Sequence, residues 1–310
     1  MMWTELLPAI GFVVFVGVVY VLAGAAAIRF WRQRDLEAVR AFDRIVLTFA
    51  ALGLVCIGYG YFVEPYRLAI THVEIRSPKL AGKHPIRIVH FSDLHSDPRP
   101  RLEPRLPQTI AAEHPDIIVF TGDSINSADA LPRLRECLSA VAKIAPTFVV
   151  RGNWDTGYWS GLDLFQGTGV RELNGDAVRL EPGGTPIWIA GLAYDNWLAL
   201  DKTIDKIPVG EFSVLLYHSP DLIQEVAKLQ VDLYLAGHTH GGQVALPLFG
   251  ALITFSQFGK RYEAGLYREE STSLYVNRGI GMEGGFAPRV RFWSRPELTV
   301  IEIRSLARTP

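Results

Sequence analysis

Residues 86–95 read Ile-Arg-Ile-Val-His-Phe-Ser-Asp-Leu-His, a short apolar run followed directly by polar side chains. The run at Ile86–Phe91 predicts a buried β-strand, because strands that are covered on both faces are almost continuously apolar. Asp93 and His95 follow the carboxyl end of this strand, which is where open α/β sheets place their active sites. The segment therefore indicates an α/β domain with a site at the edge of its sheet.

Similar short runs recur along the chain. Strands are predicted at residues 117–121, 147–151, 187–190, 212–217, 232–236, 273–277 and 298–303. Helices are expected between them at residues 102–113, 131–144 and 220–229. Strands that alternate with helices are typical of α/β proteins, so we expect one α/β domain with two sheets or one large mixed sheet.

Polar side chains follow several of these predicted strands. Each piece alone is a common turn, but together they supply two Asp, one Asn and four His. Two His at positions i and i+2 of an extended segment point to one face. Carboxylate, amide and imidazole ligands suit divalent Mn, Fe or Zn, so the combination predicts a metal site. The pieces are Asp93-Leu94-His95, Gly122-Asp123, Gly152-Asn153-Trp154-Asp155, His218 and Gly237-His238-Thr239-His240-Gly241-Gly242.

The ordered series D-x-H, G-D, G-N-x-D, H and G-H-x-H resembles the calcineurin-like metallophosphoesterase superfamily. The resemblance spans residues 86–304. The G-H-T-H-G-G-Q stretch, followed by Y-V-N-R-G-I-G, is similar to the bacterial membrane-attached branch. The resemblance implies a two-sheet α/β sandwich that holds a dinuclear metal site.

Carried over residue by residue, the resemblance implies two metal sites joined by one carboxylate. Asp93, His95 and His240 would bind one metal, and Asn153, His218 and His238 would bind the other. Asp123 would bridge them, since a carboxylate has two oxygens and can join two cations about 3.5–4 Å apart. A hydroxide between the metals would attack phosphorus in line with the leaving oxygen. Asp123, Asn153 and His218 are therefore the expected catalytic residues.

One position departs from the family pattern. The family usually has His after the Gly-Asn pair, and this chain has Trp154. An indole N–H can donate to a substrate oxyanion but cannot shuttle a proton, and loss of general acid catalysis typically costs about 10²–10⁴-fold. The substitution favours pyrophosphate bonds or activated esters, unless Asp155 points inward and serves as the acid. The alternative is that Trp154 simply packs at the site.

Other residues are open to two interpretations. Arg278 follows a late strand and would clamp a phosphate bidentately, or it forms an ordinary structural ion pair. Four aromatic residues near the motifs would line a lipid or nucleobase pocket, or they pack in the core. These are Tyr158, Trp159, Trp197 and Phe286.

The amino-terminal part of the chain is strongly apolar. Residues 8–28 and 45–63 carry no charged side chain, and about 20 such residues can cross a bilayer. The alternatives are two buried core helices or a cleaved signal peptide, although Glu5 and the lack of Lys or Arg before residue 8 do not fit a signal sequence. We expect a transmembrane hairpin with a short basic connector at residues 1–66 and the phosphoesterase domain at residues 67–310.

The charges around the hairpin predict its orientation. The connector is rich in arginine, and the positive-inside rule places such a connector in the cytoplasm. Everything after the hairpin would then lie on the extracytoplasmic side of a bacterial inner membrane. Basic residues after the second segment, beginning with Arg67, oppose this topology. The connector arginines are Arg29, Arg32, Arg34, Arg40 and Arg44.

The composition excludes several classes of protein. The 31 Lys and Arg residues balance 32 Asp and Glu residues, so no nucleic-acid partner is expected. With 49% hydrophobic and 20% charged residues, the chain is not intrinsically disordered. Two cysteines cannot form a disulfide scaffold or a four-cysteine zinc site.

These observations predict a membrane-anchored hydrolase of phosphate monoesters or diesters that uses two divalent metal ions (Mn, Fe or Zn). The first alternative is a UDP-2,3-diacylglucosamine pyrophosphatase of lipid A synthesis, since some members of the superfamily release UMP from this lipid-linked substrate. That substrate is made in the cytoplasm, which the expected topology opposes. The second alternative is a non-catalytic metal-binding module, for which Trp154 is the only support.

Overall fold

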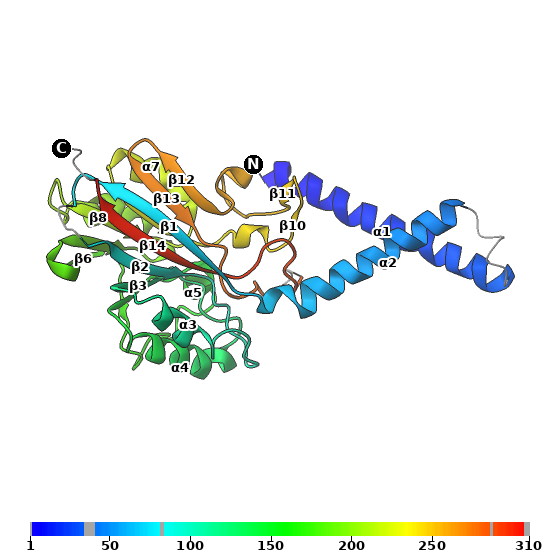
Figure 1. Ribbon diagram of the computed structural model, residues 1–310, viewed down its shortest axis with the longest axis horizontal. Helices are drawn as coiled ribbons and strands as arrows, with labels where there is room; N and C mark the ends of the chain where they lie inside the picture. Colours follow the sequence, from blue (N-terminus) through cyan, green and yellow to red (C-terminus); the bar gives the residue numbers. More distant parts are fainter. Residues whose placement is uncertain (1, 34–40, 81–83, 286–287, 307–310) are drawn as a thin grey trace.

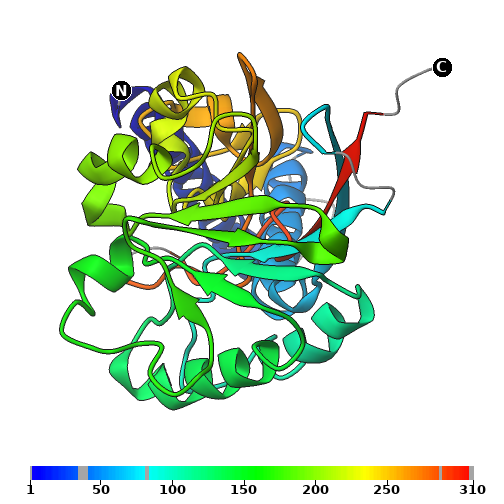
Figure 2. The same ribbon diagram turned by 90° about the vertical axis from the view of Figure 1, so that its left-hand side faces the viewer.

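The computed structural model describes residues 2–33, 41–80, 84–285 and 288–306. A pair of long helices projects from one end of an α/β domain (Figure 1). The domain contains two six-stranded sheets that lie face to face, as the end-on view in Figure 2 shows. The α/β two-sheet fold expected from the sequence is therefore confirmed.

The two large sheets are both mostly parallel. The first has the order β1 (Ala69–Ser77), β14 (Glu297–Ser305), β2 (Ile86–Phe91), β3 (Ile117–Phe120), β4 (Thr147–Val149) and β5 (Arg171–Glu172). The second has the order β12 (Gly265–Glu269), β13 (Thr272–Val276), β9 (Leu233–Ala236), β8 (Phe212–Leu216), β7 (Ile187–Gly191) and β6 (Asp176–Leu180). A small hairpin joins β10 (Ala245–Leu246) to β11 (Gly250–Ala251).

The core has three layers of apolar side chains. Ile88, Val119 and Leu235 belong to the layer between the sheets. Helices α3 (Leu106–Ala112) and α4 (Leu131–Val141) pack on the outer face of the first sheet. Helices α6 (Leu200–Ile204) and α7 (Ile223–Lys228) pack on the outer face of the second. The strands are thus covered on both faces, which is why most of them are continuously apolar.

Short helical turns complete the fold. Helix α5 (Asn153–Gly157) follows β4. The 3₁₀ turns are η1 (Glu64–Tyr66), η2 (Ala128–Ala130), η3 (Pro182–Gly184), η4 (Tyr194–Ala199), η5 (Pro220–Leu222), η6 (His240–Gly242) and η7 (Gly259–Tyr262). The helix expected at 102–113 begins only at Leu106, because Pro107 fits the first turn of a helix. The helix expected at 220–229 opens with η5.

Six strands were not predicted from the sequence: β1, β5, β6, β10, β11 and β12. Strands β5, β10 and β11 have only two residues each. Strand β1 pairs in parallel with β14 over its whole length, from Ala69 opposite Glu297 to Ser77 opposite Ser305. This pairing attaches the segment that follows the helices to the edge of the first sheet.

Helices α1 (Met2–Gln33) and α2 (Ala41–Phe62) form an antiparallel pair. Both are long and apolar enough to cross a membrane, and only 6% and 17% of their apolar windows are buried. Helices of a soluble core would be mostly buried, so the exposure does not fit the core-helix alternative. Away from the domain the two helices contact each other through Ala23, Val46 and Ala50.

The domain holds both helices at its surface. On α1, the Glu5 carboxylate accepts hydrogen bonds from the backbone N–H and the hydroxyl of Thr254. On α2, the Gly60 carbonyl accepts a 2.9 Å hydrogen bond from the Arg291 N–H. Turn η1 follows, and the boundary expected at residue 66 falls between η1 and β1. That division into two domains stays a prediction.

Candidate metal centre

Seven predicted ligands follow strand ends at one edge of the two sheets. Parallel strands present their carboxyl ends at the same edge, so residues distant in sequence meet there. Five of the seven have a left-handed backbone, with φ between 38° and 73°. Such a conformation is uncommon outside glycine, and it clusters at functional sites. The five are Asp93 and His95 after β2, Asp123 after β3, and His238 and His240 after β9.

The structure brings these side chains together in a buried cluster. Ligand atoms of Asp93, His95 and His240 lie within 4.8 Å of one another, and so do those of Asp93, Asp123 and His218. Asp93 thus belongs to both groups. Asp123 also faces both sides, because its Oδ2 lies 3.5 Å from His95 Nε2 and 3.2 Å from His218 Nε2.

The two remaining predicted ligands join the same cluster. His238 Nδ1 lies 3.0 Å from Asn153 Oδ1 and 3.3 Å from His218 Nε2. Asn153 is the first residue of α5, directly after the loop that leaves β4. All seven predicted ligands therefore converge on one point, between the carboxyl ends of β2, β3 and β4 in one sheet and β8 and β9 in the other.

Contacts behind the cluster orient two of its imidazoles. His218 Nδ1 donates a 2.6 Å hydrogen bond to the Thr121 carbonyl, and His95 Nδ1 donates a 3.0 Å bond to Asn126 Oδ1. Asn126 is fixed in turn, because its amide donates to the carbonyl oxygens of His95 and Met282. Each imidazole consequently turns its Nε2 to the centre, as metal-binding histidines with such outer partners do.

The charges of the cluster fit a divalent cation. Burial lowers the pKa values of His95 and His238 to about 4, so both are neutral, as metal ligands must be. Burial alone would raise the pKa of Asp123, but the charge and hydrogen bond of His218 hold it at about 2. His95 Nε2 is buried and hydrogen-bonds to none of the described residues. The donor set thus combines carboxylate charge with a free imidazole nitrogen.

Comparison with known proteins identifies the family. The calcineurin-like phosphoesterase family model matches residues 86–242, which include all seven clustered residues. The metallophosphoesterase YkuE of Bacillus subtilis is 35% identical over 264 residues, covering 80% of this chain and 90% of YkuE. The chain belongs to the calcineurin-like phosphoesterase family. It is a metal-dependent hydrolase of phosphate esters, and membership favours this activity over a non-catalytic metal-binding module.

Two other relatives have names that describe an activity. The UDP-2,3-diacylglucosamine pyrophosphatase LpxG of Chlamydia trachomatis is 28% identical over 304 residues, covering 77% of this chain and 90% of LpxG. The phosphodiesterase YaeI of Escherichia coli is 28% identical over 258 residues, covering 79% of this chain and 92% of YaeI. One of these relatives is thus named as a pyrophosphatase and the other as a phosphodiesterase.

Two glycines let the backbone of this phosphoesterase approach its own carboxylates. A Cβ on Gly237 would lie 2.0 Å from Ser92 Oγ and 2.3 Å from Asp93 Oδ2. A Cβ on Gly152 would lie 2.1 Å from Asp123 Oδ1. No side chain fits at either position, so both glycines are needed for the cluster to close.

Asp155 holds the loops of the site together. Its carboxylate accepts hydrogen bonds from the backbone N–H groups of Asp123, Ser124 and Gly152 at 2.8–3.0 Å. It is wholly buried. These contacts describe a structural carboxylate, and they do not turn it toward the substrate as a general acid would require.

Trp154 stands at the edge of the centre. Its backbone N–H donates a 2.9 Å hydrogen bond to Asp123 Oδ1, and its ring stands edge-on to His95 with centroids 5.2 Å apart. The indole N–H donates to Glu283 Oε1 at 3.4 Å. Trp154, Glu283 and His240 line a cavity of about 600 Å³. A role for Trp154 in substrate binding stays a prediction.

Sequence reasoning missed two residues of the site. Glu283 lies two residues after the Y-V-N-R-G-I-G stretch, and burial raises the pKa of its carboxyl group. Arg291 is wholly buried, and its Nη2 lies 3.2 Å from His240 Nδ1. Its guanidinium also donates to the carbonyl oxygens of Gly281 and Ser294. Nothing in the sequence distinguishes either residue from the other acidic and basic residues of the chain.

Arg278 forms an ion pair with Glu297. Its Nε and Nη2 donate to the two oxygens of Glu297 at 3.2 and 3.1 Å. Its contacts therefore fit the ion-pair alternative, and the phosphate clamp stays a prediction without support from them. Of the aromatic residues, Tyr158 lines the 600 Å³ cavity, Trp159 packs on the core and Trp197 is half exposed. Phe286 lies outside the described residues.

Proposed function

We propose that this phosphoesterase is membrane-anchored and that its seven clustered side chains hold two divalent metal ions, Mn, Fe or Zn. Asp93, His95 and His240 form one site, and Asn153, His218 and His238 form the other. Asp123, which faces both sides of the cluster, joins them. The observation that carries the proposal is this buried cluster opening on a 600 Å³ cavity whose far wall belongs to α1.

The chain's own residues position the reaction. When bound, the metals lower the pKa of a water toward neutrality and neutralise charge on the phosphoryl oxygens. Asp155 holds the loops that carry Asp123 and Asn153, and Asn126 fixes the ring of His95. The substrate's leaving group enters a cavity walled by Trp154 and Glu283.

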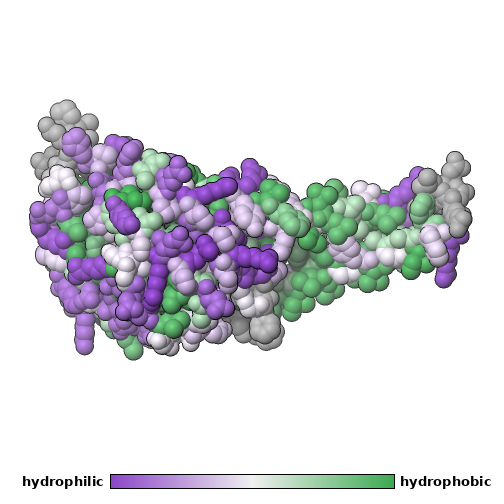
Figure 3. Space-filling view, turned by 90° about the horizontal axis from the view of Figure 1, so that it is seen from below, coloured by the Kyte–Doolittle hydropathy of each residue, from purple (hydrophilic) through white to green (hydrophobic). Residues whose placement is uncertain are grey.

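Three features support attachment to a membrane. The helices α1 and α2 are apolar and few of their residues are buried, and water does not favour such surfaces. Figure 3 shows that hydrophobic residues gather along both helices. On the domain, Phe255 and Trp293 are 63% and 64% exposed, and such aromatic side chains suit the membrane interface.

The proposed location is a bacterial inner membrane with the domain on the extracytoplasmic side. The orientation rests on the arginines of the connector, of which Arg29, Arg32 and Arg44 belong to the described residues. Arg34 and Arg40 lie outside the described residues. A reporter enzyme fused after residue 310 tests this orientation directly.

Two substrates are proposed, in order. The first is a simple phosphate monoester or diester. The second is UDP-2,3-diacylglucosamine, which the cavity beside α1 and the replacement of the usual His by Trp154 both favour. The relative LpxG supports it by name. An extracytoplasmic domain would exclude this second substrate, because it is made in the cytoplasm. No nucleic-acid partner is proposed.

The activity can be tested on full-length protein in detergent. With Mn²⁺, we expect hydrolysis of an aryl phosphodiester, and we expect a chelator to abolish it. UMP release from UDP-2,3-diacylglucosamine is followed in parallel. Release at an enzymatic rate would establish the second substrate and place the domain in the cytoplasm. A metal-loaded protein that hydrolyses neither compound would contradict the proposed function.

Replacing Trp154 by His tests whether protonation of the leaving group limits the reaction. We expect Trp154→His to raise turnover of alkyl phosphate esters by about ten-fold or more, since positioned general acids contribute about 10²–10⁴-fold. Turnover of aryl esters should change little, because their leaving groups depart without a proton. Glu283→Gln is the matched control for Trp154→His. It replaces the carboxyl group that accepts the indole N–H of Trp154 and leaves Trp154 itself in place. An unchanged alkyl-ester rate in Trp154→His would show that protonation is not limiting.

A further inference from the structure

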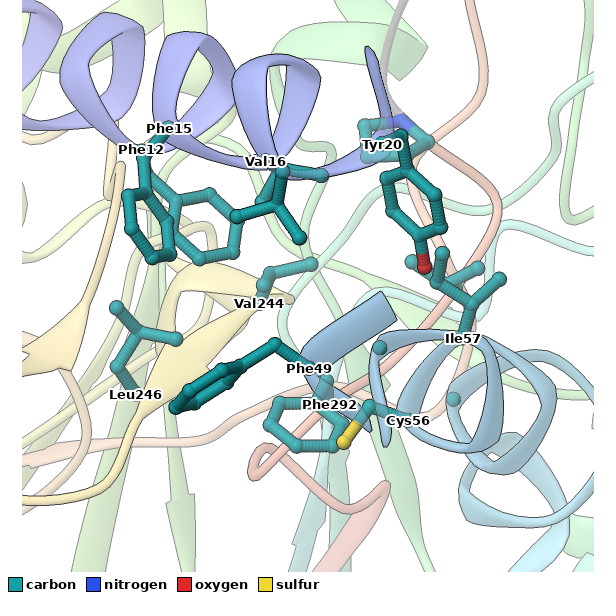
Figure 4. Close-up of a pocket in the computed structure, with 15 residues that line it drawn as sticks. Phe12, Phe15, Val16, Tyr20, Phe49, Cys56, Ile57, Val244, Leu246 and Phe292 are labelled. Carbon is teal, nitrogen blue, oxygen red and sulfur yellow. The ribbon is translucent and has the colours of Figure 1, made fainter. Parts of the chain in front are cut away.

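An apolar cavity of about 400 Å³ lies between α1, α2 and the domain (Figure 4). None of its 15 lining residues is charged. The Tyr20 hydroxyl is engaged, because it donates a 3.2 Å hydrogen bond to the Ala50 carbonyl. Aromatic and aliphatic side chains from three directions face the space, among them Phe12 and Val16 of α1, Phe49 and Ile57 of α2, and Val244 and Phe292 of the domain.

The cavity exists because the helices diverge toward the domain, as Figure 1 shows. They contact each other beyond it, at Ala23 and Ala50. On the domain side each helix has its own attachment, Glu5 to Thr254 and Gly60 to Arg291. These separate attachments hold the helices apart.

The cavity adjoins the larger cavity beside the predicted ligands. Phe12, Val244 and Pro288 line both this space and the 600 Å³ cavity that contains Trp154 and His240. The larger cavity has polar groups at the cluster and apolar side chains of α1 at its other end. The two cavities are therefore adjacent, one beside the predicted ligand His240 and the other between the helices.

We propose that these two adjacent cavities together bind the substrate, and that the cavity between the helices takes an acyl chain of a lipid that carries a phosphate or pyrophosphate group. The inference rests on the proposed function, since it places the phosphate at the clustered ligands. Both volumes lie within the range of about 300–1,000 Å³ of small-molecule sites. Transfer of a hydrocarbon chain from water into this cavity is favourable. A charged headgroup would lose its hydration there and find no charged partner in the walls, so its entry is unfavourable.

The position of the cavity fits such a substrate. If α1 and α2 span the bilayer, the cavity lies in the leaflet next to the domain. A lipid could then present its phosphate to the centre while its chain stays in apolar surroundings throughout. The substrate class is therefore an amphiphile whose headgroup phosphate lies close to its acyl chains.

Two tryptophan substitutions on α1 test the proposal. Val16 lines the cavity, so Val16→Trp fills it. Val14 is 58% exposed and does not line it, so Val14→Trp is the matched control. Both proteins and the wild type are placed in phosphatidylcholine nanodiscs with Mn²⁺. Hydrolysis of an aryl phosphodiester is then measured with increasing concentrations of an inhibitor. The inhibitors are dimyristoyl phosphatidic acid, which has long acyl chains, and dibutyryl phosphatidic acid, which has short ones.

In the wild type and Val14→Trp, we expect the long-chain phosphatidic acid to inhibit at concentrations at least ten-fold below the short-chain one. In Val16→Trp the long-chain inhibitor should lose ten-fold or more of its potency relative to the short-chain inhibitor. Differences in membrane partitioning cancel, because both variants meet the same two inhibitors in the same bilayer. Equal chain-length preference in Val16→Trp and Val14→Trp would overturn the proposal.

A second measurement needs no substitution. Cys56 lines the cavity, whereas Cys137 is buried in α4. Dimyristoyl phosphatidic acid should slow maleimide labelling of Cys56 at least five-fold, and dibutyryl phosphatidic acid should not. Equal labelling rates would overturn the acyl-chain site even where aryl hydrolysis persists. Loss of aryl hydrolysis in the wild type would instead contradict the proposed function, so the two failures are distinguishable.

Discussion

Asp123→Ala is expected to reduce metal-dependent hydrolysis to the background rate and to lower the metal content from two ions per chain to one or none. Asp123 Oδ2 lies 3.5 Å from His95 Nε2 and 3.2 Å from His218 Nε2, so its loss affects both proposed sites. Removing a bridging oxygen ligand also removes the charge that balances two cations. Activity on an aryl phosphodiester and elemental analysis of purified protein measure the two effects.

The same variant should change His218. Burial would lower the pKa of His218, but the charge and hydrogen bond of Asp123 raise it to about 10 in the unsubstituted chain. Without Asp123, the Asp93 charge and the Thr121 carbonyl still raise the pKa of His218, but burial opposes them, so this pKa should fall, which NMR of the metal-free protein would detect. Asp129→Ala, at an exposed position, is the control. Two bound metals and full activity in Asp123→Ala would refute the bridging role.

Gly152→Ala is expected to lower activity by about 10²-fold or more without removing any ligand. The added methyl would lie 2.1 Å from Asp123 Oδ1 and 2.6 Å from Asp123 N, so the carboxylate must move. Displacing a reacting group by about 1 Å commonly costs about 10² in rate. Overpacking also destabilises folded proteins by about 1–3 kcal/mol, which thermal unfolding would report.

Gly157→Ala is the matched control for this substitution. Gly157 ends α5, four residues after Asn153, and a Cβ there would meet no atom within 4 Å. We expect Gly157→Ala to retain wild-type activity and metal content. Wild-type activity in Gly152→Ala would show that Asp123 tolerates displacement, and it would contradict the close-approach argument.

Much of the site could be predicted because its ligands occur in short local patterns. Asp93 and His95 follow an apolar run, and His238 and His240 are spaced two residues apart. In each case the strand end positions the side chains, so local sequence and tertiary position agree. The long apolar strands β2, β8 and β9 could be predicted for the same reason, since burial on both faces leaves a clear pattern.

The rest depended on contacts between distant segments. Strands β6 and β12 lie at the edges of their sheet and are only partly buried. Polar residues interrupt their sequences, so neither strand contains a continuous apolar run that would predict it. Glu283 and Arg291 reach the centre from a loop between β13 and β14, so only the folded chain places them there. The cavity between the helices likewise arises from how two helices diverge, which hydropathy does not encode.

Arg291 has a practical consequence for anyone who wishes to work with a soluble form of this enzyme. Its backbone N–H binds the Gly60 carbonyl at the end of α2, while its guanidinium reaches His240. The next part of this segment is also held by the turn after α2, because the Ser294 N–H donates to the Glu64 carboxylate in η1. A truncation that begins at β1 would discard these supports and leave a buried arginine on an unsupported loop. The segment formed by α2 and η1 therefore supports the loop that reaches the predicted ligand His240, and a shortened protein should be judged as an altered enzyme.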